Sequence, residues 1–265
     1  MAVIGGTKLA VEGLATVASW KITWTEDKLS VVASNTKQTV ARICGVRDWE
    51  GQIVCYGHTP VYLPGDTFEF CGVVDGNRGV KGDCVVAAIT LLVDYANVVP
   101  LRIVYDIAGK GPLQFTTKEI TDTATPTIIC PTGLTLSLNN TPLDYVASCM
   151  IRATCSLPSY VANTTSGWRC RLTGPLDAMA VLTVWLNSSA LPSTSQTHTI
   201  QLQVEQNKAW TLQNFYLTAI QEYGASLPIG ERGELDQYRL QFQLGGTLAD
   251  GYIQFPDNRR IPPQE

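Results

Sequence analysis

The residues best suited to catalysis or metal binding are few in this chain: two histidines and eight cysteines. His58 and His198 each lie in or beside a strand-like or turn-like segment, and neither has a cysteine or aspartate at ligand spacing. No Cys-x-x-Cys pair occurs, so the spacing of a zinc or redox site is absent. Most cysteines lie in apolar runs, where a thiol acts as a small buried hydrophobic group. We therefore expect no metal site and no cofactor.

Acidic and glycine-rich segments are the remaining candidates for chemistry. Asp48 and Glu50 flank Trp49 as an acid pair would, but glycines bracket the segment Gly45–Gly51, which predicts a turn. The glycine cluster Gly72–Gly82 lacks the strand–loop–helix context of a phosphate-binding loop and predicts a hairpin. No Gly-x-Ser-x-Gly or His-Glu-x-x-His motif occurs. The sequence therefore favours a protein that is not an enzyme.

Composition narrows the class of protein further. The chain has 265 residues, of which 45% are hydrophobic and 16% charged, so a folded protein is expected rather than a disordered one. No apolar run approaches the roughly 18 residues of a membrane-spanning helix. The net charge of −4 argues against binding nucleic acid by neutralising phosphates. The first residues lack both the basic segment and the long apolar segment of a signal peptide. We therefore expect folding in a reducing cytoplasm with free thiols.

The chain repeats itself. When it is shifted by 129 positions, Ala18 to Thr25 fall on Ala147 to Thr154, and the match continues without a gap to Asp48 and Asp177. Further on, Arg102 aligns with Arg239 at an offset of 137, as loop insertions would cause. The apolar and polar positions also keep their order. We expect two copies of one domain.

Strand patterns dominate both halves. Period-2 alternation is clear in Ser19–Trp24, Arg102–Ile107 and His198–Val204, and turn signals such as Pro64–Asp66 and Lys81–Asp83 separate such runs. We expect an all-β protein made of two tandem β-sandwich or barrel domains, with at most one short helix each. The predicted boundaries are a first domain at 1–118, a Thr/Pro-rich linker at 119–132, a second domain at 133–256 and a C-terminal arm at 257–265.

The segment Arg42-Ile-Cys-Gly-Val-Arg-Asp-Trp-Glu-Gly51 resembles the tail tube proteins of tailed bacteriophages. In that family a strand carries a Gly-x-x-Asp-Trp-x-Gly-like turn, and a later strand of the Arg102–Ile107 type closes the domain. Residues 18–113 follow this layout, and residues 147–253 repeat it with Ala178 and Ala180 in place of the tryptophan and second glycine. The turn residues of the repeat are Gly45, Trp49, Gly51 and Gly174.

The resemblance implies a structural virion protein of the tandem-duplicated type. Three chains would form a ring that imitates a hexamer, and stacked rings would form the hollow tail tube through which DNA passes during ejection. The implied partners are further copies of the chain, the tape measure, tail terminator and baseplate proteins, and double-stranded DNA that passes non-specifically. The implied location is the virion tail, assembled in the cytoplasm of the bacterial host.

The resemblance also implies loops that contact the next ring, at Glu26 to Thr39 and Cys155 to Gly167. Their polar candidates are Glu26, Asp27, Lys28, Asn35, Lys37, Ser156, Ser159, Asn163 and Ser166. A tube wall that lets DNA slide should be neutral or mildly acidic, because a basic wall would hold phosphates. The candidate acidic residues of the lumen are Asp48, Glu50, Glu69, Asp177 and Glu205.

The C-terminal segment contains three prolines and predicts an arm or a frayed end, from which Arg259 and Arg260 could pair with acidic residues of a neighbour. Other functions fit the same sequence. One is another virion ring, such as a tube–baseplate or head adaptor, or a capsid decoration protein. A second is a tandem β-sandwich adhesin that stacks carbohydrate on its tryptophans. A third is a secreted enzyme with an unrecognised site.

Overall fold

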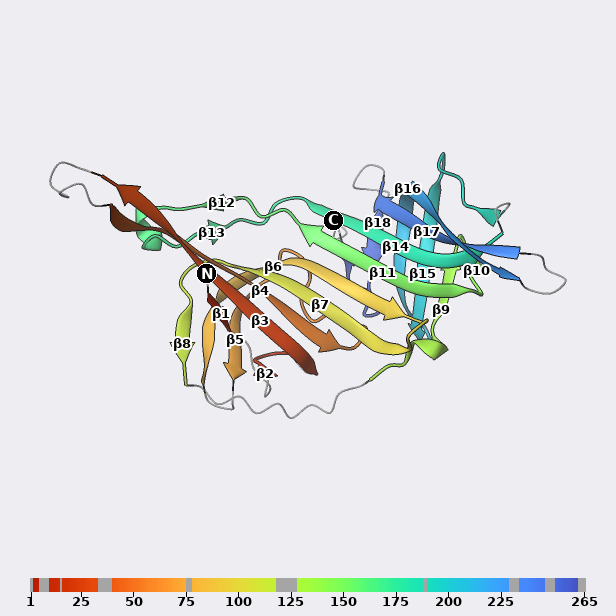
Figure 1. Cartoon of the computed structure of the whole chain (residues 1–265). Helices are drawn as coiled ribbons and strands as arrows, with labels where there is room; N and C mark the ends of the chain where they lie inside the picture. Colours follow the sequence, from red (N-terminus) through yellow and green to blue (C-terminus); the bar gives the residue numbers. More distant parts are fainter. Residues whose placement is uncertain are drawn as a thin grey trace.

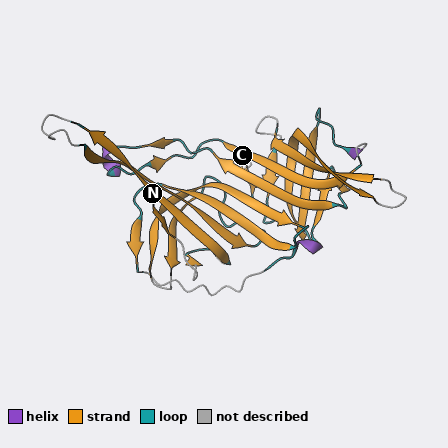
Figure 2. Cartoon of the chain, viewed as in Figure 1, coloured by secondary structure: helices purple, strands orange, loops and turns teal. Residues whose placement is uncertain are grey.

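The computed structural model describes residues 2–4, 10–14, 16–32, 40–74, 78–117, 128–187, 190–228, 234–245 and 251–261. Most of these residues are in β-strands, and the helical segments among them are the short 3-10 turns η2 (Pro131–Gly133) and η3 (Asn163–Thr165) (Figures 1 and 2). The predicted all-β class is confirmed. Most of the predicted linker, 119–127, lies outside the described residues.

Nineteen strands are described, eight before the linker and eleven after it. The first eight are β1 (Ala2–Ile4), β2 (Ala10–Val11), β3 (Val17–Val31), β4 (Ala41–Tyr56), β5 (Thr67–Val74), β6 (Arg78–Asp94), β7 (Val99–Gly109) and β8 (Gln114–Thr116). The others are β9 (Thr135–Leu138), β10 (Thr141–Pro142), β11 (Val146–Cys155), β12 (Ser159–Tyr160), β13 (Cys170–Arg171), β14 (Leu176–Leu186), β15 (Thr197–Glu205), β16 (Lys208–Pro228), β17 (Glu234–Leu244), β18 (Tyr252–Gln254) and β19 (Arg260–Ile261).

Eight long strands form one antiparallel stretch that crosses from the first half of the chain into the second. Their order is β3-β4-β7-β6-β11-β14-β17-β16. The halves meet where β6 pairs with β11, from Ser148 opposite Asp94 to Thr154 opposite Ala88. We call this pairing the internal joint. In Figure 1 these two strands lie side by side at the centre of the molecule.

Shorter strands complete a second layer in each half. The N-terminal part of β6 pairs with β5 and β8, and β2 pairs with β5. The N-terminal part of β16 pairs in the same way with β15 and β18, and β9 pairs with β15. Both β6 and β16 therefore run from one layer into the other, with a β-bulge on the way.

Equivalent residues in the two halves make equivalent pairs. Ile22 is opposite Gly51 in β3–β4, and Ile151 is opposite Ala180 in β11–β14, which keeps the predicted offset of 129 on both strands. The bulges also correspond, because the shift between Val86 and Ala88 in β6 recurs between Leu217 and Ala219 in β16. The strand order and the register thus occur twice.

The offset of the late strand differs from the one expected. Arg102 is opposite Tyr56, whereas Gln237 is opposite Trp185, so pairing relates β7 to β17 by 135 positions rather than 137. A shift of two residues keeps every side chain on its face of the sheet. The sequence match at Arg239 therefore found the right strand and face but was two residues out of register.

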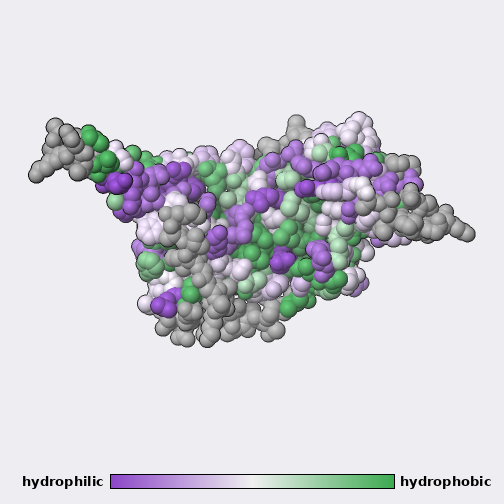
Figure 3. Space-filling view, viewed as in Figure 1, coloured by the Kyte–Doolittle hydropathy of each residue, from purple (hydrophilic) through white to green (hydrophobic). Residues whose placement is uncertain are grey.

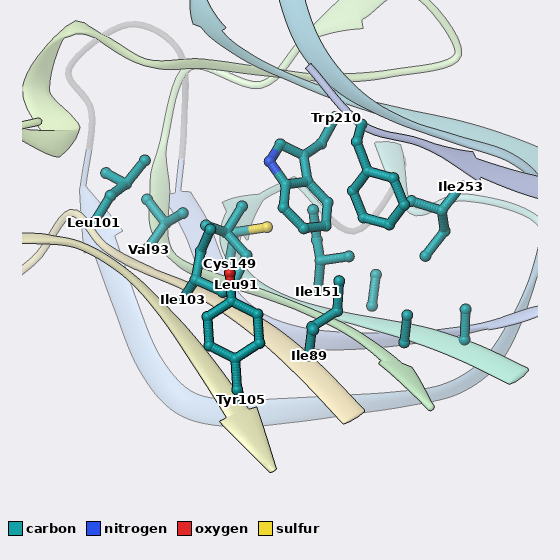
Figure 4. Packing of buried hydrophobic residues seen from close by; sticks show 14 of the residues in the cluster. Ile89, Leu91, Val93, Leu101, Ile103, Tyr105, Cys149, Ile151, Trp210 and Ile253 are labelled. Atoms are coloured by element: carbon teal, nitrogen blue, oxygen red, sulfur yellow. The ribbon is translucent and has the colours of Figure 1, made fainter. Parts of the chain in front are cut away.

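Apolar residues from both halves form one core. Leu91 of β6 and Ile151 of β11 are fully buried, and Trp210 of β16 and Ile253 of β18 pack in the same cluster (Figure 4). The alternation in β11 explains this arrangement, because Cys149, Ile151, Ala153 and Cys155 share the buried face. The core therefore runs across the internal joint and holds the halves together.

Two predicted turns are wrong. Residues Gly45 to Gly51 lie inside the continuous strand β4, and Lys81 to Asp83 lie inside β6. The glycines of β4 are explained by atoms of β3 that approach them closely, not by a turn of the chain. A Cβ at Gly45 would lie 2.9 Å from the carbonyl oxygen of Asp27, and one at Gly51 would lie 2.3 Å from Ile22 Cδ1. Gly174, the equivalent of Gly45, lies before β14, where a Cβ would be 2.8 Å from the carbonyl oxygen of Ser156.

Candidate assembly interface

The ends of the eight-strand stretch are unlike each other and resemble the two sides of the internal joint. At one end, β3 has β4 on one edge and, of the strands in the described ranges, only the short β1 on the other, from Ala2 opposite Trp24 to Ile4 opposite Ile22. At the other end, the C-terminal part of β16 pairs with β17 and, among the described residues, with no strand on its second edge. We call these the β3 edge and the β16 edge.

The two edges correspond to the strands of the internal joint. The β16 edge corresponds to the part of β6 that binds β11, and the β3 edge corresponds to the edge of β11 that binds β6. One side-chain position marks this relation. Ile89 of β6 is fully buried at the internal joint, whereas Ile220, its equivalent in β16, is 40% exposed. The β16 edge therefore leaves open an apolar position that the internal joint covers.

One face of the eight-strand stretch is polar and carries both signs of charge. Its acidic residues include Asp48, Glu50, Asp94, Asp106 and Asp177, and its basic residues include Lys21, Arg102, Arg152 and Arg239. Glutamines such as Gln52 and Gln241 lie between them. Figure 3 shows hydrophilic residues interrupting the hydrophobic area at the centre of the molecule. We call this the polar face.

Arg152 connects the halves on the polar face. Its Nη2 atom lies 2.7 Å from Asp106 Oδ2, and its Nη1 atom donates a hydrogen bond of 3.1 Å to Thr90 Oγ1. Asp106 also accepts a 3.0 Å hydrogen bond from Gln52 Nε2. Strands β4, β7, β6 and β11 thus share one network of hydrogen bonds across the internal joint.

Replacing Arg152 with alanine is expected to lower the free energy of unfolding by about 1 kcal/mol, because a partly exposed ion pair and a charged hydrogen bond are lost. Arg152→Lys should lower the free energy of unfolding by less than Arg152→Ala does. Urea unfolding at low and high salt measures both variants, and the difference from wild type should shrink as salt rises. An unchanged stability would show that the network does not hold the joint.

Five acidic residues were predicted to line a channel, and three of them lie on the polar face: Asp48, Glu50 and Asp177. Glu69 and Glu205 lie on β5 and β15, outside the eight-strand stretch. There Glu69 pairs with Lys81 at 3.6 Å, and Glu205 pairs with Lys208 at 2.7 Å. Alternation alone could not distinguish these strands, because both layers alternate polar and apolar residues.

Asp48 and Asp177 hold the same local structure in their own halves. Asp48 Oδ1 accepts the backbone N–H of Trp49 at 2.8 Å, and Asp177 Oδ1 accepts that of Ala178 at 2.7 Å. Asp48 differs in one respect, because Arg171 Nη2 and Arg169 Nε lie 2.7 and 3.4 Å from its Oδ2 atom. Its charge is therefore neutralised within the chain.

Strands β3 and β4 contact residues 167–169, which lie at and just after the end of the second segment predicted to contact the next ring. The backbone N–H of Arg47 donates to the carbonyl of Gly167 at 2.9 Å, and that of Arg169 donates to the carbonyl of Arg47 at 2.8 Å. Trp24 stacks on Trp168 with ring centroids 6.3 Å apart. In Figure 1 the β3–β4 hairpin extends from the sheet at the left, beside β12 and β13. We call this extension the hairpin arm.

The predicted loop Glu26 to Thr39 is partly strand. Glu26, Asp27 and Lys28 belong to β3, where a hydrogen bond from Arg47 lowers the pKa of Glu26. Asn35 and Lys37 lie outside the described residues. In the second segment, Ser156 follows β11, Ser159 is on β12, Asn163 begins η3 and Ser166 follows η3. Leu29 and Ile43 of the hairpin arm are more than half exposed, an apolar signal that polar composition did not indicate.

The described part of the predicted C-terminal arm, 257–261, folds back on its own chain. β19 pairs with β18, and Ile261 is buried. Arg259 pairs with Asp257 and donates hydrogen bonds to the carbonyls of Pro60 and Val61, while Arg260 Nε donates to Gln254 Oε1 at 3.0 Å. The pairing of these arginines with acidic residues of a neighbour stays a prediction.

A loop of the first half also meets the second half directly. Trp210 Nε1 donates a hydrogen bond of 2.7 Å to the carbonyl of His58, whose ring lies 3.5 Å from Glu205 Oε1. Burial lowers the pKa of His58, although the Glu205 carboxylate opposes that shift. His58 therefore has a structural place between the halves. His198 is buried between Asn139 and the carbonyl of Ser193.

The described residues offer few groups for redox chemistry or metal binding. None of the eight cysteines, all of which lie in the described ranges, forms a disulfide, and burial raises the pKa of both Cys84 and Cys149 to about 12. Within the described residues no cluster of three or more histidine, cysteine or acidic side chains is arranged to hold a metal ion. Likewise, no helix in the described part of the chain is long and apolar enough to cross a membrane.

Comparison with models of known protein families and with curated proteins found no match. The tryptophans bear on one alternative function, a surface that stacks carbohydrate. Trp20, Trp49 and Trp210 are buried, so their rings offer a sugar no stacking surface. Trp24 and Trp168 stack on each other and line one pocket, and Trp185 lines another beside Tyr145 and Leu186.

Proposed function

We propose that this protein is a structural subunit that joins head to tail with further copies into closed rings, and that the rings stack into a hollow tube for the passage of DNA. The observation that carries the proposal is the internal joint. Within one chain, β6 and β11 already join two sheets of the same strand order, and the outer ends of the sheet carry the same two kinds of edge. Repeating the joint between chains extends the sheet without a new kind of contact.

The join is heterologous, because the β16 edge of one copy meets the β3 edge of the next. Such a contact forms a ring if the rotation closes and an open fibre if it does not. Two equivalent halves per chain make three chains a six-lobed ring, which is the form implied by the resemblance to tail tube proteins. A closed sheet leaves no strand edge exposed, so closure stabilises the ring.

The polar face supports a channel for DNA rather than a DNA-binding surface. Its acidic residues are at least as many as its basic residues, and Asp106 and Arg152 are paired with each other across the internal joint. DNA binding draws on uncompensated basic charge, since each neutralised phosphate releases counterions. A glutamine-rich wall with no excess of basic charge gives the phosphates no such site, so DNA would slide along it.

Imaging and mass measurement test this proposal together. Concentrated protein should give six-lobed rings and hollow tubes by negative-stain electron microscopy, and mass photometry should show trimers as the smallest closed species. Single rings without tubes would favour an adaptor instead. Stable monomers that bind empty heads would favour a decoration protein, and stable monomers that bind glycans would favour an adhesin.

A further inference from the structure

We infer that β1 is a removable cap on the β3 edge, which keeps the free chain from joining the next copy until it is displaced. The inference rests on the proposed head-to-tail ring. It concerns the three residues Ala2–Ile4, which pair with Ile22–Trp24 of β3.

The cap occupies the site that the joint needs. At the internal joint, β6 pairs with Ser148–Thr154 of β11, and the offset of 129 places the same site on β3 at residues 19–25. β1 covers Ile22–Trp24 of that site. Two strands cannot pair with the same edge at the same residues, so β1 and the β16 edge of a neighbour exclude each other.

The second half shows where such a segment lies once a joint has formed. Pairing relates Ala10 and Val11 of β2 to Leu136 and Ser137 of β9 by 126 positions, which places the equivalents of Ala2–Ile4 at residues 128–130. These residues do not pair with β11, and the carbonyl of Ile129 accepts a 3.0 Å hydrogen bond from the backbone N–H of Leu101 at the start of β7. β6 has taken the edge of β11 instead.

The ring therefore requires an exchange. β1 leaves β3, the β16 edge of the neighbour takes its place, and the N-terminal segment moves towards the start of the neighbour's β17, where Asp236 is the equivalent of Leu101. A strand of three residues suits this role, because it shields the edge from indiscriminate pairing and yet opens at low cost. Because of the cap, assembly requires a neighbour whose β16 edge pairs with more residues of β3 than β1 does.

A reversible disulfide between β1 and β3 tests the cap. Val3 and Thr23 are opposite each other, and such residues have Cβ atoms roughly 4.5–5.5 Å apart, within reach of a disulfide. Val3→Cys and Thr23→Cys are introduced together into a chain in which the exposed Cys44 and Cys130 are serine. Thiol counting follows the bond, and light scattering with electron microscopy follows assembly. Thr23→Cys alone, treated with the same oxidant, is the matched control.

The oxidised double variant should stay monomeric, and reduction should restore assembly to the level of the control. Deleting Ala2–Ile4 should speed assembly instead. If β1 covers the edge in about nine molecules of ten, the gain in apparent association constant is about tenfold. Normal assembly of the oxidised protein, or failure of the bond to form, would overturn the cap and leave the proposed function standing. If the parent, the reduced variant and the deletion variant all stay monomeric, the proposed function fails, and the cap fails with it.

Discussion

Replacing Ile220 with aspartate is expected to abolish ring and tube formation while leaving the monomer folded. In the free chain Ile220 is 40% exposed, so a carboxylate there stays in water. In the proposed ring it takes the place of Ile89, which is fully buried, and faces Trp24 of the next copy as Ile89 faces Ala153. Burying an unpaired carboxylate costs several kcal/mol, and about 4 kcal/mol weakens association about a thousandfold.

Val98→Asp is the matched control for this variant. Val98 is also half exposed, and it lies on the turn between β6 and β7, away from the β3 and β16 edges. Mass photometry over a concentration series measures association, and urea unfolding measures the stability of each monomer. The Val98 variant should assemble as the parent does. Rings of normal stability from the Ile220 variant would show that β16 is not the joining edge.

Replacing Trp49 with alanine is expected to lower the free energy of unfolding by about 3–5 kcal/mol, the usual range for removing a buried tryptophan. The ring is 1% exposed, packs against Phe70, and donates a hydrogen bond of 2.9 Å from Nε1 to the carbonyl of Gly111. Its loss leaves both a cavity and an unpaired carbonyl. Trp185→Ala, at a half-buried site of the second half, should cost about 1–2 kcal/mol.

The second half suggests how the cavity can be filled. A Cβ at Gly109 would lie 2.3 Å from Trp49 Nε1, so the tryptophan and the glycine fit each other. At the equivalent positions the second half has Ala178 and Leu244, a small and a large residue in the opposite order. Adding Gly109→Leu to Trp49→Ala should therefore recover part of the stability. Guanidinium unfolding measures both, and a single-variant loss below about 1 kcal/mol would mean that Trp49 does not hold this core.

Much of the fold could be predicted from local pattern. Alternation identified the strands, and the offset of 129 located a pair of hairpins whose registers do correspond. The same reasoning failed where the residue type depends on contact with a residue far away in the sequence. Gly45 and Gly51 looked like turn residues because glycine is common in turns. Both lie inside the continuous strand β4, where the lack of a side chain lets β3 approach closely.

The candidate interface was largely hidden from the sequence. β6 and β16 correspond in pairing and in the position of a bulge, but their residues diverge, as Leu91 and Glu222 illustrate. No local pattern shows that β6 pairs with β11 or that Ala2–Ile4 pair with β3, because such pairing depends on residues far apart in the chain. Composition likewise gives the net charge of the chain, but it does not show that Glu69 and Glu205 lie on strands outside the eight-strand stretch.

A cross-link between chains tests the central claim most directly. Mapping the internal pair Thr90–Arg152 onto the outer edges places Gln221 of one copy opposite Thr23 of the next. With Gln221→Cys and Thr23→Cys in the chain that lacks Cys44 and Cys130, oxidation of assembled protein should give covalent trimers as the limiting product on a denaturing gel. Each single variant should give none. Absence of the cross-link in assembled protein, or a bond formed only within one chain, would contradict the head-to-tail joint.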